Sequence, residues 1–158
     1  TGLIDIGFVR PPIDRHEFET LLVLDEPLVV ALPAGDVRAG KSVLEPADFD
    51  GQPLIMYARQ GAGYFHDMLV RLFDDAGVAP DFIQHVTQIH SMLGLVQAGL
   101  AAAIVPEAAA GLHFTDVQFR RLTTVPERPV ELYMAWRRDN ANPALPPMRR
   151  LCADTARP

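Results

Sequence analysis

The sequence is poor in cysteine and contains no basic arm or stripe. Its single cysteine, Cys152, permits no intrachain disulfide and is typical of a protein from a reducing compartment. Only one lysine, Lys41, is present among 14 basic residues, which 20 acidic residues outnumber to give a net charge of −6. Because no basic arm or stripe is visible, we do not expect this chain to bind nucleic acid directly.

Long apolar runs are also absent. No run reaches the length of a membrane-spanning helix, and the opening residues TGLIDIGFVR are unlike a signal peptide. We therefore expect a cytoplasmic protein with no contact with a membrane. The 158 residues, of which 49% are hydrophobic and 22% charged, suffice for a globular core in one domain or two small lobes.

The stretch Phe82–Glu107 has the clearest secondary-structure pattern in the chain. Its pattern indicates a strand, an amphipathic helix that ends at Gly99, and a strand at 101–105 with apolar residues on both faces. The helix is indicated by apolar residues at helical spacing, namely Ile89, Met92, Leu93 and Val96. A parallel strand that follows a short crossover helix predicts an α/β sheet whose ligands bind at strand ends, near residues 87–90 and 105–107.

The rest of the chain reads as alternating strands and helices. A long helix is predicted from the apolar face of residues 65–76, with Gly77 at its end. A last helix is predicted from about Pro146 to Thr155. Its inward residues should be Leu145, Met148, Leu151 and Cys152. Strands are predicted at 3–9, 18–24, 28–32, 54–57, 81–86, 117–120 and 130–136, and one helical turn at 45–51.

The loop Arg59–Gly63 connects a buried strand to the long helix. Free amides and the positive end of the helix dipole could hold an anion there, although the lysine and hydroxyl of a phosphate-binding P-loop are missing. A flexible connector explains the glycines equally well. Arg10, at the end of the first strand, is similarly either a ligand-binding group or a solvated arginine.

Evidence for catalysis or metal binding is lacking. Four of the five histidines lie within residues 66–113, but none has convincing metal-ligand spacing on one element. His66 and Asp67 are adjacent on the predicted helix and are not expected to face each other. Cys152 reads as a small hydrophobic residue. We expect no catalytic residue, no metal and no cofactor.

Four groups of segments carry a resemblance to a known family, namely Gly2–Phe8, Pro27–Ala31, Pro46–Phe49 and Leu93–Gly99 with Ile104–Pro106. With these segments the whole chain resembles the effector-binding domain of LysR-type transcriptional regulators. Gly7–Arg10 and Gln88–Val96 look closest to regulators of aromatic-compound catabolism.

This resemblance implies two α/β lobes similar to those of type 2 periplasmic binding proteins. Residues 28–131 would form a complete second lobe, and residues 1–27 and 132–158 would be the remainder of a truncated first lobe. The chain would be the C-terminal part of such a regulator, whose DNA-binding helix-turn-helix lies outside it. The crossing strands near 24–30 and 130–133 would form the hinge.

The resemblance also implies an effector site between the lobes and partners for the protein. The effector would be a small organic anion, namely an aromatic or aromatic-derived carboxylate. The protein would self-associate as a dimer or tetramer, and would contact DNA only through the helix-turn-helix domain. The residues placed at the effector site are Arg10, Ala58, Arg59, Gln60, Gly61, Gly63, Tyr64, Phe65, Ile89, His90, Val105 and Pro106.

Two other functions are compatible with the same architecture. A solute-binding receptor of a transport system would need an export signal or a lipid anchor. An enzyme would need a nucleophile or an acid–base pair between the lobes. A regulator requires neither feature, and it is the interpretation that we favour.

Overall fold

The computed structural model describes residues 4–155, which form two compact units. The first unit combines the segment up to Asp25 with the segment from Val130 onward, and the second is Glu26–Pro129. Each junction lies two residues before the boundary expected from the sequence. None of the helices within 4–155 is long and apolar enough to cross a membrane.

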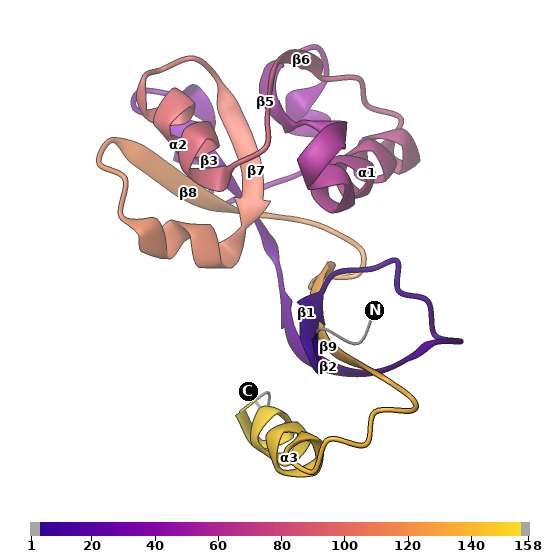
Figure 1. Ribbon diagram of the computed structural model, residues 1–158. Coiled ribbons are helices and arrows are strands. Elements are labelled where there is room, and N and C mark those ends of the chain that lie inside the picture. The colour runs from indigo at the N-terminus through magenta and orange to yellow at the C-terminus, as the bar shows by residue number, and fades with distance from the viewer. Residues whose placement is uncertain (1–3, 156–158) are drawn as a thin grey trace. The chain divides into compact units, whose positions relative to one another are not determined.

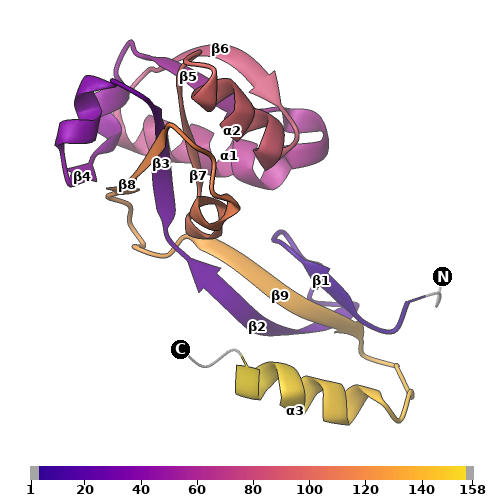
Figure 2. The same cartoon turned by 90° about the vertical axis from the view of Figure 1, so that its left-hand side faces the viewer.

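The first unit is a three-stranded sheet with one helix packed on it (Figure 2). The strands lie in the order β1 (Gly7–Val9), β9 (Val130–Arg137) and β2 (Phe18–Glu26), and the helix is α3 (Leu145–Thr155). Its core is a cluster of residues from β9 and α3 with neighbours from β2. The members are Met134, Trp136 and Leu145, against which Ile6, Leu21, Val23, Met148 and Cys152 pack.

Two predictions for this unit are wrong. Within residues 4–9, the strand expected at 3–9 forms only at Gly7–Val9, because among these described residues only 7–9 pair with β9, at 133–135. Position 3 lies outside the described residues. Leu151, expected to face inward, is 60% exposed, because the buried side of α3 follows Leu145, Met148 and Cys152.

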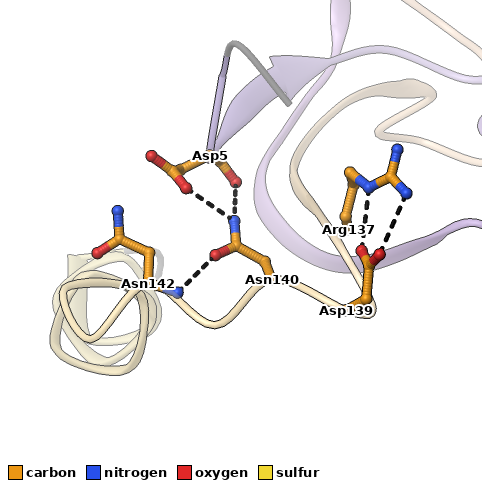
Figure 3. A network of polar contacts seen from close by, with 5 residues as sticks. All are labelled: Asp5, Arg137, Asp139, Asn140 and Asn142. Carbon is orange, nitrogen blue, oxygen red and sulfur yellow. Dashed lines mark hydrogen bonds and ion pairs between the residues drawn. The ribbon is translucent and has the colours of Figure 1, made fainter. Parts of the chain in front are cut away.

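Polar side chains fix the loop between β9 and α3 (Figure 3). Asn140 Nδ2 donates to the carbonyl oxygen of Asp5 at 3.0 Å and to its Oδ1 at 3.2 Å. The amide of Asn142 donates to Asn140 Oδ1 at 2.8 Å, and the amide of Ala144 to Asn142 Oδ1 at 2.9 Å. These turns anchor the start of α3 to the segment before β1.

The second unit contains a six-stranded mixed sheet (Figure 1). Its strands in spatial order are β4 (Val43–Leu44), β8 (Val117–Leu122), β3 (Leu28–Pro33), β7 (Ala102–Pro106), β5 (Pro53–Tyr57) and β6 (Asp81–Val86). Strand β3 is antiparallel to β7 and β8, whereas β5 is parallel to both β6 and β7. The predicted α/β class is confirmed.

Two α-helices and three 3₁₀ turns complete this unit. They are α1 (Arg59–Ala76), α2 (Ile89–Gln97), η1 (Val37–Gly40), η2 (Pro46–Phe49) and η3 (Glu107–Leu112). Helix α1 contacts β5, and α2 contacts β3 and β7. The buried residues of α2 are Met92, Leu93 and Val96. Gly77 and Gly99 have the left-handed φ values of 65° and 81° that the sequence predicted for helix ends.

Candidate functional site

The site is built on three adjacent strands of the second unit that end at one edge of its sheet. Leu54 of β5 is aligned with Ala102 of β7, and Tyr57 at the end of β5 is aligned with Val86 at the end of β6. Because all three strands are parallel, their carboxyl ends meet at one edge. Ligands of open α/β sheets bind at such an edge, beside the loops that follow the strands.

The start of α1 is distorted at this edge. Its N-cap residue, Ala58, donates its amide to Val86 O at 2.8 Å and supplies no side-chain cap. Gln60, Gly61 and Ala62 have non-helical backbone angles, with φ of 87° at Gly61. A Cβ at position 61 would also lie 3.3 Å from Thr87 Cγ2. Glycine is therefore required here both for the backbone angle and for the close approach of the loop after β6.

Aromatic rings cluster where β5 ends and α1 begins. The rings of Tyr57 and Phe65 are stacked with centroids 4.9 Å apart, and Tyr64 meets Phe65 edge-on at 5.2 Å. Tyr57 is buried, whereas Tyr64 and Phe65 are half-buried. The turn thus combines backbone donors with an apolar wall, which is the usual make-up of a small-molecule site.

Hydrogen bonds tie the site segments to both places where the chain passes between the units. Tyr64 Oη, on α1, donates to Pro129 O at 3.3 Å. After β7, the amide of Glu107 donates to Pro27 O at 3.0 Å, and the amide of Ala108 to the buried Glu26 Oε2 at 2.8 Å. Sequence reasoning missed Glu26, because nothing in the sequence distinguishes a buried carboxylate at a strand junction from a solvated one.

The second unit brings eleven of the twelve predicted site residues to the ends of these strands. Ala58–Phe65 follow β5, Ile89 and His90 follow β6, and Val105 and Pro106 end β7. Arg59, Gln60, Gly61 and His90 are exposed, whereas Val105 and Pro106 are buried. Arg10 belongs to the first unit, where its Nη1 donates to Glu131 O at 2.9 Å.

The histidines do not form a metal site. Among residues 4–155, no group of three or more histidine, cysteine, aspartate or glutamate side chains is placed to hold a metal ion. The expectation that His66 and Asp67 do not meet is wrong, since His66 Nδ1 lies 2.9 Å from Asp67 Oδ1. Side-chain torsions bring the two groups together at the helix surface, and the hydrogen bond with His66 lowers the pKa of Asp67.

Fold and sequence together identify the family. The two-unit α/β architecture is that of type 2 periplasmic binding proteins, and residues 1–157 match the family model of the LysR substrate binding domain. The chain belongs to this family. That conclusion agrees with the resemblance found in the sequence.

Curated relatives carry the names of transcriptional regulators. The chain is 28% identical to the regulator AlsR of Bacillus subtilis over 144 residues, which cover 91% of the chain and 47% of AlsR. It is 29% identical to the Hca operon transcriptional activator HcaR of Escherichia coli over 145 residues, covering 91% of the chain and 48% of HcaR. The chain thus spans about half the length of these relatives.

Solved structures share the fold. The LysR-family regulator CbnR superposes with a TM-score of 0.84 over 98% of this chain and 53% of its own, at 24% identity. The effector-binding domain of BenM, solved with its effector benzoate, superposes with a TM-score of 0.79 over 99% of this chain and 74% of its own, at 23% identity. At these identities the likeness establishes the fold.

Proposed function

We propose that this chain is the effector-sensing part of a LysR-type transcriptional regulator. The observation that carries the proposal is the distorted, glycine-dependent start of α1 at the shared end of β5, β6 and β7, in a chain that matches the family model throughout. In this proposal a small molecule binds at that edge of the sheet and changes the activity of the regulator. DNA would be contacted by another part of the same protein, because this chain carries a net charge of −6.

The ligand we propose is a small organic carboxylate, aromatic or derived from an aromatic compound. Amides at the start of α1 and the helix dipole favour negative charge, and Arg59 adds a cation to the same turn. Tyr64, Phe65 and Ile89 supply apolar surface for a ring. The benzoate bound to BenM and the regulators of aromatic catabolism that the sequence resembles support this ligand class.

We include Arg10 in this proposal as a second cation for the ligand. A guanidinium can hold a carboxylate with two parallel hydrogen bonds. The hydrogen bonds from Tyr64 to Pro129 and from Ala108 to Glu26 would transmit a movement of the site segments to the two places where the chain passes between the units. A ligand then shifts the equilibrium between arrangements of the two units by its difference in affinity for them.

Calorimetry on the regulator that contains this chain tests the site, with benzoate and the non-aromatic cyclohexanecarboxylate as probes. We expect benzoate to bind more tightly than the non-aromatic acid. Arg10→Ala removes a charged hydrogen bond and should weaken binding of benzoate by about tenfold to hundredfold. Gly61→Pro should abolish binding, because proline cannot adopt φ of 87°.

Arg71→Ala is the matched control, since Arg71 is exposed and lies further along α1. Its Nε donates a hydrogen bond to the carbonyl oxygen of Asp67. This variant should bind as the parent does. Unchanged affinity in both Arg10→Ala and Gly61→Pro would eliminate the proposed site while leaving the family assignment intact. Failure of both acids to bind to the parent would instead eliminate the proposed ligand class.

A further inference from the structure

The first unit carries an arginine-lined groove that has no part in the proposed effector site. It lies between the start of β2, the end of β9 and α3, with a volume of about 610 Å³. Four arginines line it, namely Arg15, Arg138, Arg149 and Arg150, and the only carboxylate among its lining residues is Glu19. This concentration of positive charge stands out in a chain whose net charge is −6.

Trp136 lines the groove and contacts two of its charged residues. Its Nε1 donates to Glu19 Oε2 at 3.1 Å, and the guanidinium carbon of Arg149 lies over its ring, 4.3 Å from the centroid. Stacking on an indole restricts a guanidinium to one plane while leaving its N–H edge accessible. Arg149 therefore loses less conformational freedom on binding a ligand than a freely moving arginine would.

Glu19 only partly neutralises the surrounding guanidinium groups. Its oxygens lie 3.7 Å from Arg138 Nη1 and 4.0 Å from Arg149 Nη1, and both distances exceed those of hydrogen bonds. Arg138 instead donates through Nη2 to the carbonyl oxygen of Arg15 at 2.9 Å. This bond anchors Arg138 to the segment before β2 and leaves Nη1 available to a second acceptor.

We propose that this groove binds a small oxyanion that carries two or more negative charges, supplied by phosphate groups or by clustered carboxylates. Planar guanidinium groups match the oxygen spacing of both chemistries. One internal carboxylate against four arginines leaves an excess of positive charge, which favours a multivalent anion over a monovalent one. The volume is within the range of roughly 300–1,000 Å³ found for small-molecule sites.

The chain's single tryptophan provides the assay, because Trp136 lies in the groove. Inorganic pyrophosphate and citrate are titrated separately into the 158-residue chain at constant ionic strength, with fluorescence and calorimetry as readouts. We expect a saturable signal with at least one of them. Pyrophosphate alone would indicate phosphate recognition, and citrate alone recognition of clustered carboxylates. Potassium chloride at matched ionic strength should give no saturable signal.

Removing an arginine and removing the charge of Glu19 should have opposite effects on the affinity for the anion. Arg138→Gln and Arg150→Gln should each weaken binding by about tenfold, since each removes one charged partner. Glu19→Gln keeps an acceptor for Trp136 Nε1 but removes the competing charge, and should tighten binding by about threefold or more. Arg121→Gln, on an exposed arginine of the second unit, should have no effect.

Three results would overturn the proposal, provided that circular dichroism confirms folding of each variant. The first is the absence of saturable binding of either anion by both methods. The second is a loss of affinity in Arg121→Gln as large as in Arg138→Gln and Arg150→Gln, which would mean that only the overall charge of the chain matters. The third is weaker binding in Glu19→Gln, which would make Glu19 part of the ligand contact instead of its competitor.

Discussion

Asp36 and Arg38 form a largely buried ion pair at the start of η1, with side-chain exposures of 10% and 15%. Asp36 accepts hydrogen bonds from the backbone amide, Nε and Nη2 of Arg38, at 2.9, 2.9 and 2.6 Å. The guanidinium also lies over the ring of Phe49, 5.1 Å from its centroid. Side-chain hydrogen bonds from Arg38 lower the pKa of Asp36 below its ordinary value of 3.8, and partial burial only partly opposes this effect.

This pair predicts a pH-dependent contribution to stability. Because the pKa is lower in the folded state, the contribution is complete above pH 3.8 and is lost as the pH falls through the folded-state pKa. Asp36→Asn keeps the acceptor for the Arg38 amide but loses the charge, and should lower the free energy of unfolding by about 1 kcal/mol at neutral pH.

Urea unfolding at neutral pH and at about pH 3 measures this difference. The gap between parent and variant should narrow at the lower pH. Asp139→Asn, which disrupts the exposed pair with Arg137, is the control and should change stability little. A gap that stays the same at both pH values would show that charge is not the cause.

At the scale of elements, replacing glycine with alanine should have opposite effects on stability at two positions that differ in backbone conformation. Gly77 ends α1 with φ of 65°, where a Cβ is strained, although no atom lies within 4 Å of the Cβ position. Gly94 lies inside α2 with the same open surroundings and no positive φ. Gly77→Ala should destabilise the protein by about 1 kcal/mol, and Gly94→Ala should stabilise it by about 0.5–1 kcal/mol.

Chemical denaturation of both variants tests this prediction. Because neither added methyl group meets a neighbour, the difference isolates backbone conformation from packing. Destabilisation by both substitutions would mean that helix α2 cannot accommodate even a small side chain at position 94.

The elements that the sequence predicted best are those with their own start and stop signals. Strand β6 forms at Asp81–Val86 as expected, and α1 ends at Gly77, because periodicity and glycine act locally. The described part of the segment 3–9, residues 4–9, has equal β-propensity but forms a strand only where β9 offers a partner. The antiparallel place of β3 between β7 and β8 depends on contacts distant in sequence, which local patterns do not encode.

The same distinction applies to the candidate site. The turn after β5 was predictable, because glycines between a strand and a helix indicate exposed amides. The bonds of Tyr64 to Pro129 and of Glu26 to Ala108 were not, because each joins residues more than sixty positions apart. Patterns in the sequence therefore identified the turn of the proposed site, but not the hydrogen bonds that connect the site segments to residues 26 and 129.

At the scale of the whole molecule, β2 leaves apolar side chains exposed. Leu21 and Val23 pack against the core of the first unit, so the alternate residues Leu22 and Leu24 point to the other face of the strand. Leu22 is 39% exposed and Leu24 is 42% exposed. Neighbouring apolar residues exposed on one face of a strand are a common feature of association surfaces.

We predict that the chain self-associates and that this face of β2 contributes to the contact. Light scattering over a range of concentrations should detect species larger than a monomer. Leu22→Glu combined with Leu24→Glu should shift the population towards monomer, because a carboxylate buried in an apolar contact loses its hydration.

Val37→Glu is the matched control, since Val37 is 91% exposed in the second unit and its replacement should leave the distribution unchanged. A monomeric parent at high concentration would refute self-association of this chain. A double variant that associates as the parent does would place the contact on another surface.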